Sequence, residues 1–328
     1  MAIEQAIHGS IRFDRKNQLL IPNISMEIFR RKLKAITDAV DWRVRLKFGD
    51  EAIDNRIVGA GFRYRQFLEK TTFFGIAGSV GKTTAKELLV GVLNVRGRTI
   101  GNPNSLNAAP EIAKVVLRTR PWHKFCVAEL GETAPGSLDK QLAVLQPSIG
   151  IITVVGDDHL AAFGSRQAIA LEFAKLVQTT PTHGTIVLNL DDQLVAALSK
   201  DAKCRVITYG TCAIADLQAT EIVSIWPDPL QFTATYKGES VSIRTQLNGK
   251  QLLTSALAAI GGGLAAGLTL SDCAKGISSA FPAEGRMQPV PCSQGVTFIR
   301  DDFKAPAWTV RPLLDHLRDA KKKKKIFV

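Results

Sequence analysis

The sequence predicts an α/β fold built around a parallel sheet, and three observations predict it. The first is a glycine-rich segment, GSVGKTT at residues 78–84, which follows an apolar run and precedes a helix-like run. The second is the alternation of strand-like and helix-like segments from residue 71 onward, which is typical of a parallel sheet with helical crossovers. The third is that each buried-looking strand stops at polar or acidic residues, where ligands bind in such sheets.

Length and composition allow two domains with sizeable cores and disfavour several classes of protein. The chain has 328 residues, of which 45% are hydrophobic and 22% are charged, as in soluble globular proteins. Its five cysteines are irregularly spaced, so neither a disulfide framework nor a zinc site is predicted. The N-terminus lacks the pattern of a signal peptide, and a cytoplasmic location is therefore expected.

The charge balance is basic, with 42 Lys and Arg against 30 Asp and Glu and a formal net charge of +12. Such an excess suits anionic ligands such as nucleotides and weakly suggests nucleic acid. The sequence carries no RNA-binding aromatic motif and no zinc-finger spacing, so no nucleic-acid partner is expected. A nucleic-acid-associated protein that uses its Lys and Arg runs stays an alternative, which salt-insensitive ATP binding without RNA or DNA binding would exclude.

Residues 1–70 are predicted to form a basic N-terminal segment that matches no domain we can assign. Within it, residues 26–40 have helical spacing and residues 42–48 alternate between apolar and basic side chains.

The segment that follows has the strand, glycine loop and helix order of a phosphate-binding loop. A strand is expected over residues 72–77 and a helix from residue 85. Backbone N–H groups of the loop and the helix N-terminus would bind phosphate oxygens. Lys82 would reach the β- and γ-phosphates, and the Thr83 hydroxyl would bind Mg²⁺. Ile76 stands where the usual pattern has glycine, so a glycine turn that happens to carry Gly-Lys-Thr is the alternative. The predicted contacts are Gly78, Ser79, Gly81, Lys82, Thr83 and Thr84.

Three later strands are predicted over residues 125–128, 149–155 and 185–189, and the first two lead to candidate metal ligands. Glu129 follows the first strand directly, and His159 follows the second. Both should share one edge of the sheet with the phosphate loop, where a carboxylate and an imidazole suit a divalent metal. The alternatives are a solvated carboxylate at a strand end and a histidine that caps a helix or lies in the core.

Residues 252–270 carry no charge and approach the length of a membrane span. Because Gly261, Gly262 and Gly263 lie in the middle, we favour a buried helix, a turn of small residues and a second element beginning near Leu268. No membrane span is therefore expected.

The rest of the chain is predicted to hold a hairpin and the beginning of another domain. Residues 230–247 alternate around Lys237-Gly238-Glu239, which indicates an antiparallel hairpin. A strand is expected over residues 296–300, a helix over 310–317 and a further strand over 325–328. One strand, one helix and part of a strand do not make a domain, so the C-terminus is expected to be the start of a domain that is cut off.

Two further candidates for nucleotide binding come from loops. Asn102 lies with Asn104 and Asn107 after residues 99–101, although such residues are also ordinary turn formers. Arg286 could pair with phosphate, and a plain surface arginine is the alternative.

Taken together, these residues resemble the Mur ligase superfamily, and most closely its members that add D-alanyl-D-alanine to a UDP-muramoyl tripeptide. The resemblance extends over roughly residues 71–328. The matching segments are GIAGSVGKTTAKELL from Gly75, TIGNPNSLNAAP from Thr99, VAELGETAPGSL from Val127, GIITVVGDDHLAAFGS from Gly150, IVLNLDD from Ile186, SALAAIGGGLAAGL from Ser255, EGRM from Glu284 and DDFKAP from Asp301.

The resemblance implies an ATP-dependent amide ligase of peptidoglycan precursor synthesis that works through an acyl phosphate. It implies a central ATP-binding domain over residues 71–293 and the start of a Rossmann-like C-terminal domain over 294–328. Lys82 and His159 would be catalytic, and Thr83, Glu129 and His159 would hold Mg²⁺. Arg286 with Asp301 or Asp302 would contact the nucleotide. The substrates would be a UDP-muramoyl peptide or another carboxylate and an amino acid or dipeptide, and the protein is expected to be a monomer.

The chain departs from the family pattern in four places, which keeps as the alternative a nucleotide-binding protein or ATPase with the same fold and no ligation activity. Phe173 stands where the family has a metal-binding carbamylated lysine, and Lys175 would lie on another helix face. Residues 251–255 replace the family's His-Asn-x-x-Asn near the adenine. The N-terminal segment is unlike the usual UDP-sugar-binding domain, and most of the third domain is missing. We therefore expect ATP binding with slow or no peptide-bond formation by this chain.

Overall fold

The computed structural model divides the chain into two compact units, Met1–Arg56 and Ile57–Val328. Residues that the structure describes are 12–13, 19–20, 49–293, 296–303, 306–321 and 325–326. In the first unit, strands β1 (Arg12–Phe13) and β2 (Leu19–Leu20) pair antiparallel. The elements expected over residues 26–40 and 42–48 lie outside the described residues, and the boundaries at 70 and 293 stay predictions.

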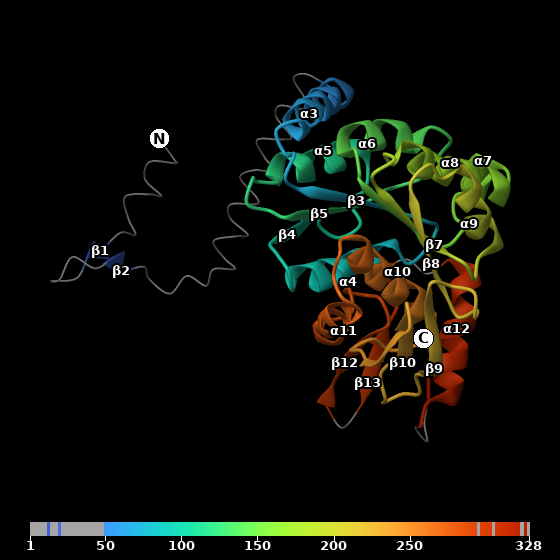
Figure 1. Ribbon diagram of the computed structural model, residues 1–328. Helices are drawn as coiled ribbons and strands as arrows, with labels where there is room; N and C mark the ends of the chain where they lie inside the picture. Colours follow the sequence, from blue (N-terminus) through green and yellow to red (C-terminus); the bar gives the residue numbers. More distant parts are fainter. Residues whose placement is uncertain are drawn as a thin grey trace. The chain divides into compact units, whose positions relative to one another are not determined.

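The described part of the second unit is organised by a nine-stranded sheet that is mostly parallel (Figure 1). Only β10 runs against its two neighbours. The chain leaves β3 toward β5 and β4 on one side and toward β6 on the other, so the order of strands reverses beside β3. Along the sheet the strands are β11 (Glu239–Arg244), β10 (Gln231–Tyr236), β9 (Leu217–Val223), β8 (Arg205–Gly210), β7 (Thr185–Asn189), β6 (Ile149–Ile152), β3 (Thr72–Ala77), β5 (Phe125–Glu129) and β4 (Thr99–Gly101).

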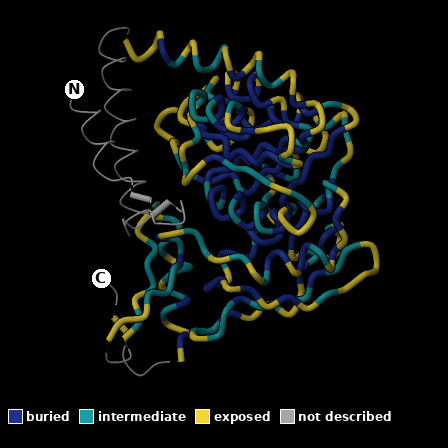
Figure 2. The backbone as a smooth tube through the Cα atoms, turned by 90° about the vertical axis from the view of Figure 1, so that its left-hand side faces the viewer, coloured by how far each residue is buried: buried dark blue, intermediate teal, exposed yellow. Residues whose placement is uncertain are grey.

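Helices cover both faces of this sheet and bury two hydrophobic cores (Figures 1 and 2). One core lies under α4 (Lys82–Asn94), α10 (Leu253–Ala265) and α11 (Leu270–Ser279). The other lies under α5 (Ala109–Arg118), α6 (Ser137–Leu145) and α8 (Arg166–Thr179). The α/β sheet predicted from the sequence is confirmed. Further elements are α3 (Asp50–Arg65), α7 (Leu160–Phe163), α9 (Gln193–Ala197), η1 (Leu198–Asp201), η2 (Lys250–Leu252), β12 (Gln288–Pro291), β13 (Thr297–Arg300) and α12 (Ala307–Asp319).

The predicted hairpin is confirmed as β10 and β11, which pair antiparallel around Lys237 and Gly238. Both turn residues have positive φ, 49° and 83°. A two-residue turn of this kind matches the twist of the flanking strands.

The prediction of a turn at Gly261–Gly263 was wrong, because α10 continues through all three glycines. A Cβ on Gly261 would lie 2.6 Å from Val187 Cγ1, and one on Gly262 would lie 2.8 Å from Ile151 Cδ1. The glycines therefore let the helix lie directly on the sheet, where burial offsets their weak helix propensity. The second element begins as predicted, at Leu270.

The last residues differ in part from the expectation. The strand expected over 296–300 is β13, which pairs with β12 in a separate antiparallel pair. The helix expected over 310–317 is α12. Lys325 and Ile326 are not in a strand, and the remaining residues of the predicted strand lie outside the described part. Among the described helices, none combines the length and the apolar character that crossing a membrane requires.

Replacing Gly276 with alanine is expected to lower the free energy of unfolding by about 1–3 kcal/mol, as overpacking does. The added Cβ would lie 2.4 Å from the Val92 Cα, and this backbone atom of α4 cannot rotate away as a side chain can. Equilibrium denaturation would measure the effect. The matched control is Gly59→Ala, because a Cβ on Gly59 meets no atom within 4 Å; it should gain about 0.4–1 kcal/mol. Equal effects of the two substitutions would contradict this account of α11 packing.

Candidate functional site

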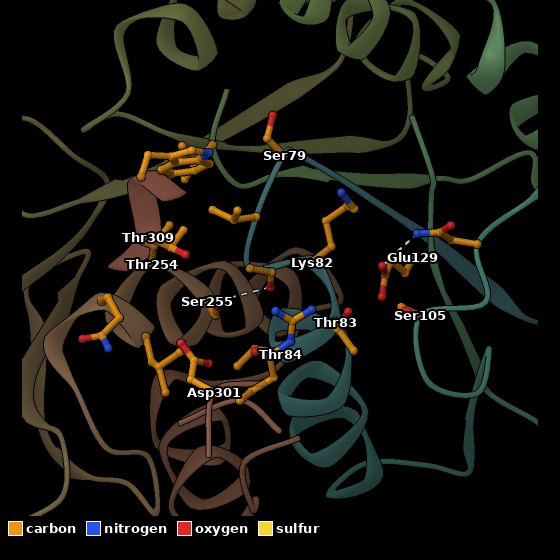
Figure 3. A pocket seen from close by; sticks show the side chains of 18 of the residues that line it. Ser79, Lys82, Thr83, Thr84, Ser105, Glu129, Thr254, Ser255, Asp301 and Thr309 are labelled. Atoms are coloured by element: carbon orange, nitrogen blue, oxygen red, sulfur yellow. Dashed lines mark hydrogen bonds between the residues drawn. The ribbon is translucent and has the colours of Figure 1, made fainter. Parts of the chain in front are cut away.

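Many polar residues converge on a cavity of about 550 Å³ at the carboxyl ends of the central strands (Figure 3). Its lining comes from the loops after β3, β4, β5 and β6, from the start of α10, and from the C-terminal segment. The residues that line it are Ser79–Thr84, Ser105, Asn107, Glu129, Gly131–Thr133, Val154, His159, Gln251, Leu252, Thr254, Ser255, Arg286, Met287, Asp301, Trp308, Thr309 and Pro312.

The glycine loop can form only with glycine at two positions. Gly78 has φ 134°, and a Cβ there would lie 2.0 Å from Thr153 Oγ1. Gly81 has φ 81° and precedes the first residue of α4. A side chain at either position would be strained or would clash. The backbone conformation of this loop therefore requires glycine at both positions. Gly78 itself does not line the cavity.

Neighbouring segments hold the loop in place through hydrogen bonds. Thr153 Oγ1 donates to the Val80 carbonyl at 2.6 Å, and Ser255 Oγ donates to the Gly81 carbonyl at 3.1 Å. Ser79 Oγ accepts from the Gly156 N–H at 2.9 Å. The loop is therefore preorganised by the segment after β6 and by α10 before any ligand binds.

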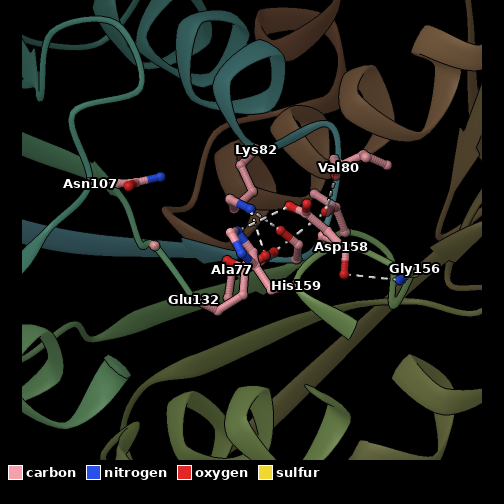
Figure 4. A network of polar contacts seen from close by, with 12 residues as sticks. Ala77, Val80, Lys82, Asn107, Glu132, Gly156, Asp158 and His159 are labelled. Carbon is pink, nitrogen blue, oxygen red and sulfur yellow. Dashed lines mark hydrogen bonds and ion pairs between the residues drawn. The ribbon is translucent and has the colours of Figure 1, made fainter. Parts of the chain in front are cut away.

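Lys82 lies in the cavity beside a carboxylate that sequence reasoning missed. Its Nζ donates to Glu132 Oε1 at 2.9 Å and to the Gly78 carbonyl. Both side chains of the pair are buried, with 7% and 1% exposed, and Figure 4 shows them with Asp158 and His159 in one polar network. The Lys82 ammonium has three donors, so it can contact the loop and also an anionic ligand in this cavity.

Glu129 provides the observation that best fits a cation. Its Oε1 accepts from Asn107 Nδ2 at 2.9 Å, whereas Oε2 is buried and has no hydrogen-bond partner among the described residues. Figure 3 shows Glu129, Ser105 and Thr83 on the same side of the cavity. A buried carboxylate oxygen beside a hydroxyl at a helix N-terminus is the kind of oxygen donor set that Mg²⁺ takes together with phosphate oxygens.

Asn102 does not line the cavity and instead anchors the loop after β4. Its Oδ1 accepts from the Glu129 N–H at 2.9 Å, and its Nδ2 donates to the Leu106 and Glu129 carbonyls. Buried Lys86 donates to the carbonyls of Asn102 and Asn104 from α4. The structure thus gives Asn102 a role in placing Asn107 against Glu129, and direct nucleotide contact by Asn102 stays a prediction.

His159 lines the cavity from the loop that follows β6. Its backbone is left-handed, with φ 54° and ψ 22°, which is uncommon for a residue other than glycine and often marks a functional position. The imidazole Nε2 lies 3.5 Å from Asp158 Oδ2, and the side chain is 36% exposed. The structure therefore brings Glu129, His159 and the phosphate loop to one edge, as the sequence predicted.

The C-terminal segment contributes opposite charges to the same cavity. Burial lowers the pKa of the Arg286 guanidinium, against the opposing effect of Asp301 and Glu129. Burial raises the pKa of the Asp301 carboxyl group. The hydrogen bond that Asp301 accepts from the Met287 N–H opposes this rise. Asp302 lies outside the cavity, where it pairs with Arg300. Of the two aspartates predicted to contact a nucleotide, Asp301 is the one that the structure brings to the site.

Phe173 is fully buried in the core under α5, α6 and α8. Lys175, two residues later, pairs with Asp139 at 2.6 Å and Glu172 at 3.0 Å, and it does not line the cavity. Neither side chain lines the cavity.

Four lining residues were not among the predicted site residues. Glu132 and Ser255 lie within segments that resemble the family, and Thr254 lies in the stretch that replaces the family's motif near the adenine, so the resemblance held a signal for these three. Trp308 had no such signal, and it enters the cavity through the tertiary fold.

Comparison with known families matches the part of the chain that holds most of this cavity. Residues 76–263 match the Mur ligase middle domain. UDP-N-acetylmuramoyl-tripeptide–D-alanyl-D-alanine ligase from Mycobacterium tuberculosis H37Rv is 32% identical over 247 residues, covering 75% of this chain and 48% of that protein. The enzyme of the same name from Bacillus subtilis is 28% identical, covering 72% and 50%. The chain therefore spans about half the length of these curated relatives.

Solved structures agree with this similarity. A crystal structure of MurF from Acinetobacter baumannii superposes with a TM-score of 0.77 at 26% identity, covering 81% of this chain and 58% of that one. MurF ligase from Thermotoga maritima in complex with ADP has a TM-score of 0.72 at 17% identity, covering 81% and 61%. The second likeness shows the fold alone.

Proposed function

Because this chain belongs to the Mur ligase family, we propose that it binds MgATP and takes part in ATP-dependent formation of an amide bond. The observation that carries the proposal is the pairing, in one cavity, of a glycine loop with Lys82 and a buried Glu129 oxygen that has no hydrogen-bond partner among the described residues. The Lys82 ammonium suits the phosphates of a nucleoside triphosphate, and the Glu129 oxygen suits the metal ion that the triphosphate carries.

In the proposed reaction, the γ-phosphoryl group of ATP passes to a substrate carboxylate, and ADP leaves. An amine then attacks the carbonyl carbon of the acyl phosphate, and phosphate leaves as the amide forms. Lys82 would orient the phosphates, and Arg286 and Asp301 would contact the nucleotide. Thr83 and Glu129 would hold Mg²⁺, which offsets charge on the phosphate oxygens. His159 would lie near the acyl phosphate, where the sequence resemblance places a second metal.

The substrates we propose are a UDP-muramoyl peptide as the carboxylate and an amino acid or dipeptide as the amine. The names of the relatives from M. tuberculosis and B. subtilis support this choice. A place in peptidoglycan precursor synthesis, a cytoplasmic location and a monomeric state follow as predictions from the same resemblance.

Calorimetry with MgATP, followed by an assay of phosphate release, tests the proposal. The chain should bind MgATP, and the slow phosphate release that we expect from it should depend on UDP-muramoyl tripeptide and D-alanyl-D-alanine. Release that ignores both substrates, or binding with no release, would instead support the alternative of a nucleotide-binding protein without ligation. No binding of MgATP would overturn both functions.

Replacing Glu129 with glutamine is expected to raise the Mg²⁺ concentration needed for half-maximal ATP binding by at least about tenfold. Loss of a residue that only hydrogen-bonds to a metal ligand already lowers metal affinity by this factor. The glutamine amide removes the negative charge of the Glu129 carboxylate and keeps the shape of the side chain. A titration of ATP binding at fixed ATP and varied Mg²⁺ would measure the shift. Glu239→Gln is the control, because Glu239 is exposed on β11 and outside the cavity. An unchanged Mg²⁺ dependence would remove Glu129 from the metal site.

A further inference from the structure

The cavity has a second end that the phosphate chemistry does not use. Figure 3 shows Thr254 and Thr309 across the cavity from Glu129 and Ser105, with Lys82 between the two groups. The first turn of α12 brings Trp308 and Thr309 to this cavity. A triphosphate held at Lys82 with its terminal phosphate toward Glu129 would therefore extend its nucleoside toward α12.

The lining of the cavity includes apolar surface suited to a flat ring. Leu252, Met287 and Pro312 supply aliphatic surface, and Leu252 and Met287 are buried. Among the described residues that line the cavity, Trp308 is the only Phe, Tyr or Trp. Sites that bind bases without reading their sequence use aromatic rings for stacking.

The position of the Trp308 indole is fixed by a close contact with Gly156. A Cβ on Gly156 would lie 2.3 Å from Cζ2 and 2.6 Å from Cη2 of the indole. The Gly156 N–H in turn donates to Ser79 Oγ, so the ring is seated on a segment that the phosphate loop itself holds. The indole N–H is buried and has no hydrogen-bond partner among the described residues. A ring that is held this way can be ready for a ligand before the ligand arrives.

We propose that Trp308 is the aromatic surface on which the base of the bound nucleotide stacks, and that Gly156 positions it. This inference rests on the proposed nucleotide binding.

The test compares MgATP with magnesium tripolyphosphate, which carries the phosphates and no base. In calorimetry, Trp308→Ala should weaken MgATP binding by about 5–150-fold, which corresponds to the loss of one base–aromatic stack, and should leave tripolyphosphate affinity unchanged. Trp308→Phe should keep most of the MgATP affinity. Gly156→Ala, which displaces the ring without removing it, should weaken MgATP binding selectively as well.

A spectroscopic readout separates stacking from a purely structural role. MgATP should quench tryptophan fluorescence in the wild type, and this change should disappear in Trp308→Phe and persist in Trp122→Phe, because Trp122 is 61% exposed and outside the cavity. Equal weakening of ATP and tripolyphosphate by Trp308→Ala, or weakening of neither, would overturn the inference alone. If the wild type binds neither MgATP nor magnesium tripolyphosphate, the proposed nucleotide site is overturned, and the inference with it.

Discussion

Replacing Lys82 with alanine is expected to weaken MgATP binding by about 10–150-fold. The substitution removes a charge-assisted hydrogen bond to phosphate, which contributes on the order of 1.5–3 kcal/mol. It is also expected to lower the free energy of unfolding by about 3–5 kcal/mol, because the buried Glu132 carboxylate loses its lysine partner. Calorimetry with MgATP and urea denaturation would measure the two effects separately.

A double variant distinguishes ligand binding from stability. Lys82→Ala combined with Glu132→Gln should regain part of the stability, because the charge that was left buried is gone. It should not regain MgATP affinity, since the ammonium is still absent. If Lys82→Ala binds MgATP as tightly as the wild type, the glycine loop is not a phosphate site.

Replacing Phe173 with alanine is expected to lower the free energy of unfolding by about 3–5 kcal/mol. The ring is fully buried, so its removal loses the transfer free energy and leaves a cavity. Phe173→Lys should be at least as damaging, because the ammonium would have to leave water without a partner. It is therefore not expected to restore a metal ligand.

Leu171→Ala on the same helix is the control for Phe173. Leu171 is 69% exposed, and its loss should change the free energy of unfolding by less than about 0.5 kcal/mol. Urea denaturation of the three variants measures the contrast. A wild-type free energy of unfolding in Phe173→Lys would show that position 173 tolerates a charge and can face the site.

The sheet and its ligand-binding edge could be predicted because local signals agree there. The glycine loop, the buried strands and the polar residues at their ends obey short-range rules, so Glu129 and His159 were placed correctly beside Lys82. The turn predicted at Gly261 failed for the opposite reason. Glycine disfavours a helix locally, and only the contact of α10 with Val187 and Ile151 explains why the helix continues.

The roles of Glu132 and Trp308 could not be predicted from local patterns. A glutamate in a loop is usually solvated, and the burial of Glu132 depends on where β5 ends relative to α4. Trp308 is far from Lys82 in the sequence, and it enters the cavity only because α12 packs over Gly156. Both residues are placed by tertiary packing, which a single sequence does not encode in any regular spacing.

The order in which helices cover the sheet has a consequence for synthesis on the ribosome. The face under α5, α6 and α8 is made from residues that emerge soon after their strands. The opposite face receives α4 early, but α10 and α11 close it only after residues 253–279 have emerged. Nascent chains therefore expose this apolar face until α10 and α11 have been synthesised, and exposed apolar surface of this kind favours chaperone binding and aggregation.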